Sequence, residues 1–340
     1  MKRVAVVILN YNGKSFLERF LPKVIESCNP AWAEVVVADN ASTDGSVEFM
    51  RERFPHIRLI ENGCNGGFTV GYNMALKQVE AQYYVLLNSD IEVTPGWIEP
   101  VIDLMDADRQ IAACQPKILS FHHPERFEYA GACGGFIDKL GYPFCRGRVF
   151  QHLEKDEGQY DEAVEVFWAT GACMFVRADL YRQMGGLDDS FFAHMEEIDL
   201  CWRLKNAGYK VYCCPASKVY HIGGGTLPKN SPRKTYLNFR NNLSLLVKNL
   251  PEKRVRPVIA YRIFLDWVAA TKFLCEGCFK DFAMVFKAHR DFYRRLPALR
   301  AKRADARHRD VSCIYRKNIV VQSMLFRKSK YSELAEGDFS

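Results

Sequence analysis

The stretch YYVLLNSD, residues 83–90, decides the fold. Residues 83–87 are all hydrophobic, and a short uninterrupted run of this kind is typical of a strand buried on both faces. The polar tripeptide Asn88-Ser89-Asp90 follows at the point where such a strand would end. Asn and Asp are ordinary turn formers, so the tripeptide is a weak signal alone and its meaning depends on the rest of the chain.

Three earlier segments repeat this pattern of a hydrophobic run followed by polar residues. Residues 4–9, 35–38 and 58–60 have strand length, and polar clusters follow the first two at residues 10–13 and 39–45. Amphipathic helical periodicity separates these runs, which predicts an α/β fold with a mostly parallel sheet flanked by helices. Ligands bind outside the carboxyl ends of the strands in such sheets, so the polar clusters should converge in space.

The rest of the chain divides by composition. Residues 120–165 are rich in glycine and irregular, which predicts a loop-rich insertion over one face of the sheet. Beyond residue 231 glycine becomes rare and long helical periodicity begins. We therefore expect one α/β domain over residues 1–230, a helical extension over 231–300, and a basic, flexible tail over 301–340.

Composition and charge limit the classes of protein. The chain has 340 residues, of which 48% are hydrophobic and 26% charged, which excludes fibrous and wholly disordered classes. Residues 281–330 carry fourteen Lys or Arg against four Asp, an excess larger than the net charge of +7 on the whole chain. Interleaved aromatic residues make this region either a basic surface for anionic lipid or a solvated helix face, and both interpretations stay open. No recognition motif favours nucleic acid as a partner.

Membrane and targeting signals are weak. Residues 4–9 are too short for the core of a signal peptide, and no segment has the eighteen uninterrupted apolar residues of a spanning helix. We therefore expect a cytoplasmic protein, peripheral at the inner face of the plasma membrane through its C-terminal region.

The polar clusters have a chemistry suited to a phosphorylated ligand. The carboxylate of Asp90 can bind a hard divalent cation that in turn holds a diphosphate, and Asn88 can hydrogen-bond to a sugar hydroxyl. Asp39 can accept hydrogen bonds from a nucleobase or a ribose. The glycine-rich stretch 62–73 lets bare backbone approach a ligand, although neither a dinucleotide fingerprint nor a Walker loop is present.

Taken together, these residues resemble the family 2 inverting glycosyltransferases of GT-A fold, in particular the rhamnosyltransferase-like branch that builds bacterial surface polysaccharides. The resemblance extends in order and spacing over about residues 4–225. The matching motifs are VILNYN (7–12), DNASTDGS (39–46), NGGF (65–68), GYN (71–73), NSD (88–90), GACM (171–174), GGLD (185–188), FF (191–192), EEIDLCWR (196–203) and His221.

The resemblance implies roles for individual residues. Asp90 and His221 correspond to ligands of Mg²⁺ or Mn²⁺, and Asp39 to the carboxylate that contacts the base. Residues 1–115 correspond to the half that binds the nucleotide sugar, and residues 116–230 to the half that binds the acceptor and the metal. The expected substrate-binding and nucleotide-binding residues are Asn10, Asn12, Asp39, Asn40, Ser42, Asn65, Gly66, Gly67, Phe68, Asn73, Asn88, Ser89 and Trp202.

The catalytic base is expected at Glu197, the second acidic residue of the pair that the family carries at this place. The family usually has Asp there, so Glu197 is a departure. Successive helical residues point about 100° apart, so Glu196 and Glu197 cannot both act on one acceptor hydroxyl. If the longer Glu197 is not tolerated, Glu196 or Asp199 is the base.

The sequence thus predicts a metal-dependent inverting glycosyltransferase that moves a sugar from a UDP- or dTDP-sugar to a glycan or lipid-linked acceptor. One alternative is a nucleotidyltransferase that makes nucleoside-diphosphate sugars, but residues 10–14 (NYNGK) do not resemble the triphosphate-binding loop it would need. The other is an inactive nucleotide-binding scaffold, which the departure at Glu197 leaves open.

Overall fold

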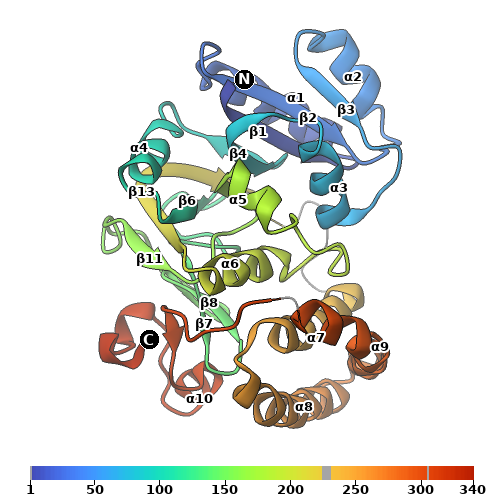
Figure 1. Ribbon diagram of the computed structural model, residues 1–340, viewed down its shortest axis with the longest axis vertical. Helices are drawn as coiled ribbons and strands as arrows, with labels where there is room; N and C mark the ends of the chain where they lie inside the picture. The colour runs from blue at the N-terminus through green and yellow to red at the C-terminus, as the bar shows by residue number, and fades with distance from the viewer. Residues whose placement is uncertain (1, 224–230, 305) are drawn as a thin grey trace.

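The computed structural model describes residues 2–223, 231–304 and 306–340, and Figure 1 shows a large α/β layer above a smaller sheet and a group of C-terminal helices. Within the described residues the main sheet has the strand order β11-β13-β6-β12-β4-β1-β2-β3, with β5 paired to β13. Its strands are β1 (Lys2–Asn10), β2 (Ala33–Asp39), β3 (Arg58–Glu61), β4 (Ala81–Asn88), β5 (Ile91–Val93), β6 (Ile111–Ser120), β11 (Val164–Val166), β12 (Cys173–Arg177) and β13 (Lys210–His221).

The first four expected strands form the parallel part of this sheet, in the order β4-β1-β2-β3. In the register, Asn10 lies opposite Asp39 and Leu9 lies opposite Asn88, so the carboxyl ends of three strands meet at one edge. Strand β12 is antiparallel to β4 and β6, whereas β6 and β13 are parallel. The sheet is therefore mixed but mostly parallel, as predicted.

Helices cover both faces of the main sheet because its strands are apolar on both sides. Val4 and Val6 belong to one buried cluster, and Ala5 and Val7 belong to another, as the alternation of a strand requires. Helix α1 packs on the first cluster, while α3, α5 and α6 contribute to the second. The helices are α1 (Lys14–Glu26), α2 (Ser46–Arg53), α3 (Gly67–Leu76), α4 (Glu99–Ala107), α5 (Ala178–Gln183) and α6 (Glu196–Asn206).

The region expected to be irregular, residues 120–165, forms most of a second sheet instead. This sheet has the order β10-β9-β8-β7-β14, and its strands are β7 (Gly135–Asp138), β8 (Pro143–Cys145), β9 (Arg148–Val149), β10 (His152–Leu153) and β14 (Ile314–Tyr315). Strands of two to four residues are too short to leave a hydrophobic period in the sequence.

The expectation of a flexible tail over residues 301–340 is wrong for its second half. Strand β14 pairs in parallel with β7, the rings of Tyr331 and Phe339 pack against Phe136, and the ring of Tyr315 packs against Phe144 and Phe339. Helix α10 (Ile319–Met324) begins where the buried carboxylate of Asp138 accepts a hydrogen bond from the backbone N–H of Ile319 at 3.0 Å. Two 3-10 turns, Tyr331–Glu333 and Glu336–Asp338, complete the segment. These distant partners order a stretch that is basic and looks disordered by composition.

The C-terminal helical region is confirmed. It consists of α7 (Pro232–Asn249), α8 (Glu252–Cys275) and α9 (Phe279–Ala304), which pack together beside the second sheet (Figure 1). Lys248 of α7 and Lys302 of α9 both pair with the buried carboxylate of Asp188, so ion pairs hold these two helices against the α/β domain. No helix in the described residues is both long and apolar enough to cross a bilayer.

Candidate functional site

The carboxyl ends of β1 and β2 hold a hydrogen-bonded polar cluster. Asn10 donates from Nδ2 to the carboxylate of Asp39 at 2.9 Å, and the backbone N–H of Ser42 donates to the other oxygen of Asp39 at 2.8 Å. The hydroxyl of Ser42 accepts from the backbone N–H of Asn12 at 2.8 Å. Asp39 is only 2% exposed, and each carboxylate oxygen keeps further acceptor capacity. Four expected ligand-binding residues therefore come together, with Asp39 fixed at their centre.

A small opening lies between this cluster and the end of β4. A side chain at Gly13 would place its Cβ 2.5 Å from Oδ1 of Asn10 and 3.3 Å from Oγ of Ser89, so only glycine leaves the space open. Oδ1 of Asn10 is buried and has no hydrogen-bond partner among the described residues. A buried unpaired acceptor beside a serine hydroxyl is suited to a ligand with a hydrogen-bond donor.

Asn40 has a structural role in the positions observed. Its Nδ2 donates to the carbonyl of Gly67 at 2.9 Å, and its Oδ1 accepts from Nδ2 of Asn62 at 2.8 Å. Gly71 gives the room for this contact, since a Cβ there would lie 2.6 Å from the Asn40 amide. Asn40 therefore joins the end of β2 to the glycine-rich loop, and its polar atoms are committed to the protein.

The glycine-rich loop is held to the segment before α6. The backbone carbonyl of Phe192 accepts hydrogen bonds from the N–H groups of Phe68 at 2.8 Å and Thr69 at 3.3 Å, at the N-terminus of α3. Gly67 has φ of 73° and approaches Phe192 so closely that a Cβ would lie 2.6 Å from that carbonyl oxygen. Asn65, which is exposed, turns the loop by accepting from the N–H of Gly67 at 3.0 Å, with Gly66 between them.

Asp90 and His221 face each other next to the end of β4. Strand β5 pairs with β13 so that His221 lies opposite Ile91, and Nε2 of His221 is 3.2 Å from Oδ1 of Asp90. Both side chains are buried. Nδ1 of His221 lies 3.2 Å from Oε2 of Glu128, a residue that sequence reasoning missed because no motif surrounds it in the region expected to be loops.

The pair of Asp90 and His221 fits a divalent cation. Two neighbouring ligands of an octahedral ion with bonds near 2.1 Å are separated by about 3 Å, close to the distance observed. Glu128 contacts the opposite nitrogen of the imidazole, so it orients the ring rather than sharing that ion. No group of three or more His, Cys, Asp or Glu in the described part of the chain could hold a metal by itself. Oxygen atoms of a bound diphosphate would complete the coordination of the cation.

Electrostatic attraction between His221 and the carboxylates of Asp90 and Glu128 shifts the pKa of all three groups. Burial disfavours the charged imidazolium, but hydrogen bonds and attraction from Asp90 and Glu128 outweigh it and raise the pKa of His221 to about 10. Burial likewise works against the two carboxylates, yet His221 holds the pKa of both Asp90 and Glu128 below the usual range. The imidazolium of His221 thus balances two ionised carboxylates in the protein interior, and a divalent cation that bound to Nε2 would displace the proton there.

Helix α6 places Glu196 and Glu197 differently at its first turn. Glu196 is only 5% exposed, whereas Glu197 is partly exposed, and each has an Oε2 that is buried without a hydrogen-bond partner in the described residues. Burial raises the pKa of Glu197 to about 7. Burial and the charge of Glu197 also raise the pKa of Glu196. The carboxyl of Glu197 can therefore ionise near neutral pH.

Glu197 lies close to the edge of the sheet that carries the polar tripeptide. A Cβ added at Gly171 would lie 3.8 Å from Cβ of Glu197 and 2.9 Å from the ring of Phe68, so these three residues surround one spot. The carbonyl of the next residue, Ala172, accepts a hydrogen bond from the backbone N–H of Asn88 at 2.9 Å. A carboxylate with a raised pKa thus stands near the strand end that leads to Asp90.

Asp199 is not available as a base. It is fully buried and is bound by Arg203 at 2.8 Å, Lys248 at 2.8 Å and Asn249 at 2.9 Å. These cationic partners outweigh the effect of burial and lower the pKa of Asp199. Helix α7, which carries Lys248 and Asn249, covers this side of α6. Asp199 instead joins α6 to the C-terminal helices.

Trp202 does not line the site, which corrects the expectation that it binds substrate. Its side chain is 1% exposed and packs edge-on against Phe167, with ring centroids 5.2 Å apart. A helix that covers a sheet must bury its apolar stripe, and Trp202 belongs to that stripe.

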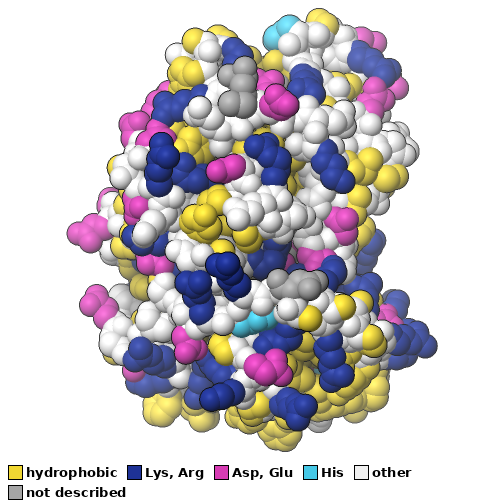
Figure 2. All heavy atoms as spheres, in the orientation of Figure 1, with side chains coloured by type: hydrophobic (Ala, Val, Ile, Leu, Met, Phe, Trp, Pro, Cys, Tyr) yellow, Lys and Arg dark blue, Asp and Glu magenta, His cyan; other side chains and the backbone are white. Residues whose placement is uncertain are grey.

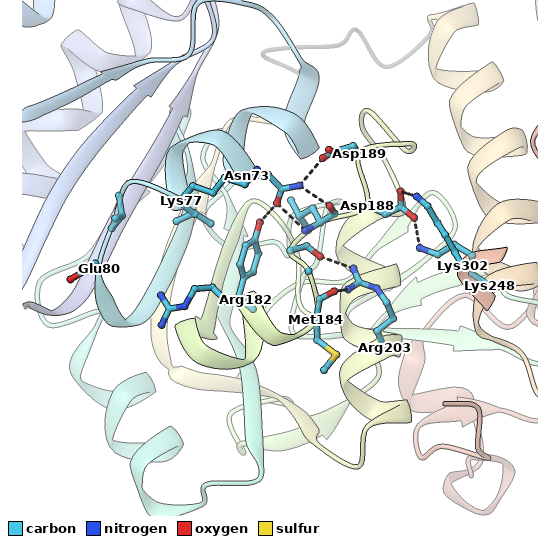
Figure 3. Close-up of a pocket in the computed structure, with 16 residues that line it drawn as sticks. Asn73, Lys77, Glu80, Arg182, Met184, Asp188, Asp189, Arg203, Lys248 and Lys302 are labelled. Carbon is cyan, nitrogen blue, oxygen red and sulfur yellow. Dashed lines mark hydrogen bonds and ion pairs between the residues drawn. The ribbon is translucent and has the colours of Figure 1, made fainter. Parts of the chain in front are cut away.

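Asn73 also has a structural role rather than the expected one. Its Nδ2 donates to the carbonyl of Leu187 at 2.7 Å and to Asp189, and its Oδ1 accepts from the hydroxyl of Tyr181 at 2.7 Å. Figure 3 shows these bonds at the wall of a cavity of about 970 Å³ beside α3, α5 and α6. Arg203, Lys248 and Lys302 line the same cavity, but each is bound to protein oxygens there. The cavity contains none of the other expected site residues.

Comparison with known proteins identifies the family. The model for the family described as "Glycosyl transferase family 2" matches residues 5–185, more than half of the chain. The N-acetylglucosaminyl-diphospho-decaprenol L-rhamnosyltransferase of Mycobacterium tuberculosis is 28% identical over 234 residues, covering 64% of this chain and 75% of that protein. The low-salt glycan biosynthesis hexosyltransferase Agl10 of Haloferax volcanii is 23% identical over 70% of this chain and 73% of that protein.

Solved structures show the same fold. GalNAc-T7 with UDP, GalNAc and Mn²⁺ superposes with a TM-score of 0.57 at 16% identity, covering 74% of this chain and 49% of that chain. The S. aureus TarS fragment 1–349 with UDP-GlcNAc gives 0.55 at 16% identity over 88% of this chain and 83% of that chain. With its GT-A architecture, this chain belongs to glycosyltransferase family 2.

Proposed function

We propose that this chain transfers a sugar, with inversion, from a UDP- or dTDP-sugar to a glycan or lipid-linked acceptor, with Glu197 as the base. The observation that carries the proposal is the position of Glu197, whose carboxylate has a buried unpaired oxygen and a pKa near neutrality. Glu197 lies beside Gly171, and the residue after Gly171, Ala172, accepts a hydrogen bond from the backbone N–H of Asn88. A general base works best when its pKa lies near the operating pH.

The reaction balances with the groups that the chain supplies. The acceptor hydroxyl oxygen forms a bond to the anomeric carbon while its proton passes to Glu197, and the bond from that carbon to the diphosphate oxygen breaks with its electron pair. Asp90 and His221 would hold Mg²⁺ or Mn²⁺, and such an ion, when bound, offsets the charge of the leaving diphosphate. Glu128 orients the imidazole of His221 through Nδ1. Asp39 would accept hydrogen bonds from the nucleobase or the ribose of the donor.

The relatives, and not the site, support the proposed nature of the acceptor. The mycobacterial relative is named for a decaprenol-linked substrate, which supports a lipid-linked acceptor for this chain as well. An enzyme that acts on such a substrate works at a membrane surface. We therefore assign the chain to the cytoplasmic side of the plasma membrane, in peripheral contact with anionic lipid.

Donor binding tests the first half of the proposal. UDP and dTDP, and then their sugar derivatives, are titrated calorimetrically with and without Mn²⁺, using wild type and Asp90→Ala. We expect Mn²⁺-dependent binding in wild type, and loss of the metal dependence in Asp90→Ala because one of two protein ligands is gone. A wild-type protein that binds no sugar nucleotide in the presence of metal would refute the proposal.

Release of nucleoside diphosphate tests the second half. Wild type, Glu197→Gln and the matched control Glu196→Gln are incubated with the donor that binds and with an extract of lipid-linked acceptors. Wild type and Glu196→Gln should release diphosphate only when acceptor is present, and Glu197→Gln should not. Binding by wild type without turnover on any acceptor would favour the alternative of an inactive scaffold.

A further inference from the structure

Helix α8 exposes hydrophobic side chains on the face that a surface helix normally makes polar. The exposed fractions are 59% for Phe264, 53% for Val268 and 42% for Leu274, and Tyr261 and Trp267 lie exposed on the same side. Their spacing of three, four and seven residues makes one continuous stripe. Between Pro257 and Thr271, the exposed positions of α8 contain no charged residue.

The charged residues in this part of α8 point inward instead. Arg262 and Asp266 are 3% and 1% exposed, and Asp266 pairs with His289 of α9 at 3.0 Å and with Arg262 at 3.6 Å. The guanidinium of Arg262 also stacks 3.7 Å from the ring centroid of Tyr142. The helix is thus oriented by buried charge pairs with its apolar stripe outward, the reverse of an ordinary amphipathic surface helix.

Helix α9 extends the apolar surface. Phe279, Phe286 and Tyr293 are exposed at intervals of seven residues, on one side of the helix. The rings of Trp267 and Phe286 meet edge-on with centroids 4.4 Å apart, so the two stripes form one surface. We call it the α8–α9 face, defined by Tyr261, Phe264, Trp267, Val268, Leu274, Phe279, Phe286 and Tyr293.

A second exposed hydrophobic segment lies at the same end of the molecule. Met324, Leu325 and Phe326, at the end of α10, are consecutive and are 65%, 74% and 65% exposed. Arg327 and Lys328 follow them directly. Figure 1 places α8 and α10 together at the lower end, and Figure 2 shows hydrophobic side chains over both elements there, with Lys and Arg among them.

Positive charge surrounds the apolar residues. The exposed acidic residue within the described helices α8 and α9 is Glu252, and Glu276 lies exposed between the two helices. The exposed basic residues of the two helices are more numerous, and include Lys272, Lys280, Lys287, Arg290 and Arg294. Aromatic side chains mixed with Lys and Arg suit the headgroup region of an anionic bilayer, where rings enter the interface and cations remain at the phosphates.

We propose that the α8–α9 face and the Met324–Phe326 segment together dock this protein on an anionic lipid bilayer. A second copy of the chain fits less well, because a symmetric contact would set the basic residues of one α9 near those of the other. The inference goes beyond the proposed reaction, and it is tested without donor or acceptor, so either can fail alone.

Co-sedimentation of the full chain with vesicles tests the docking face. Vesicles of phosphatidylcholine with about 30 mol% phosphatidylglycerol are compared with phosphatidylcholine alone at physiological salt. We expect wild type to bind the anionic vesicles, and Phe264→Glu and Leu325→Glu each to weaken binding at least about tenfold because a charge replaces an inserted apolar group. Both positions are exposed, so thermal unfolding midpoints should match wild type.

A matched pair of variants isolates the contribution of charge. Lys280→Ala removes one exposed cation from α9 and should weaken binding to anionic vesicles about fivefold. Arg53→Ala removes one exposed cation from α2, at the opposite end of the molecule (Figure 1), and should leave binding unchanged.

Two outcomes would overturn the proposal. One is wild-type binding to anionic vesicles that is absent, or that Phe264→Glu and Leu325→Glu leave unchanged. The other is a wild-type dimer in sedimentation velocity that Phe264→Glu converts to monomer while vesicles bind neither form, which would make the face a contact between copies.

Discussion

The pH dependence of transfer is the sharpest consequence of the site, because burial raises the pKa of Glu197 to about 7. A base must be ionised to accept the proton of the acceptor, so the rate should rise with pH and reach half its maximum near pH 7. About a tenth of Glu197 is ionised one unit below its pKa and about nine tenths one unit above, so the rate should increase about tenfold between pH 6 and pH 8.

The assay is single-turnover release of nucleoside diphosphate with donor and acceptor saturating, measured across this pH range. Saturation separates the chemical step from the protonation of groups that bind the donor. Glu197→Gln keeps the size of the side chain but cannot accept a proton, so the rate should fall about 10²- to 10⁴-fold and lose its dependence on pH. Glu197→Asp keeps a carboxylate one methylene shorter, so it should retain a pH-dependent rate below that of wild type.

Glu196→Gln is the matched control. Burial and the charge of Glu197 raise the pKa of Glu196, whose side chain is more deeply buried than that of Glu197. Glu196 is not the base in the proposed reaction, so an amide of the same size at this position should leave the rate and its pH midpoint nearly unchanged. If Glu196→Gln abolishes transfer and Glu197→Gln does not, or if Glu197→Gln keeps the pH profile of wild type, the assignment of the base is wrong.

Three further substitutions test other parts of the site. Asp39→Asn should weaken UDP binding about tenfold or more, because a charged acceptor is lost, and unchanged binding by calorimetry would remove Asp39 from the nucleotide site. Glu128→Gln should weaken Mn²⁺ binding about 10- to 100-fold in the presence of UDP, while metal-free UDP binding stays constant. Asp199→Asn should lower the free energy of unfolding by about 3 kcal/mol, because Arg203 and Lys248 both lose a buried carboxylate partner, as urea denaturation would show. A stable Asp199→Asn protein that has lost transfer activity would instead indicate that Asp199 takes part in the reaction.

The local pattern of hydrophobic runs followed by polar residues was sufficient to predict the parallel part of the sheet. The hydrophobic runs that became β1 and β4 are buried on both faces, and the polar residues after them meet at one edge because parallel strands share direction. Asp39 and Asp90 could be chosen for the same reason, since each lies at the end of a strand, whereas Glu197 was implied by the family resemblance.

Local pattern failed where a partner distant in the chain determines what a side chain does. Trp202 and Asn73 have residue types suited to sugar binding, but packing against Phe167 and the loop at Leu187 occupies them. Asp199 is covered by α7, which begins thirty-three residues later. Glu128 has no recognisable motif, and only the strand pairing that brings β13 beside β5 and β6 sets it against His221.

The sequence by itself determined the family, the parallel sheet and the edge at which its polar residues gather, because these depend on the period and order of residues close in the chain. The tertiary structure alone decided which acidic residue of α6 remains free to ionise near neutral pH, since that depends on how deeply each carboxylate is buried and which cations approach it. It also decided that the basic C-terminal segment folds, and that α8 turns its charges inward and its aromatic residues outward. A charge pair such as Asp266 with His289 forms only when two helices pack, so the outward face of α8 is set by contacts and not by its own periodicity.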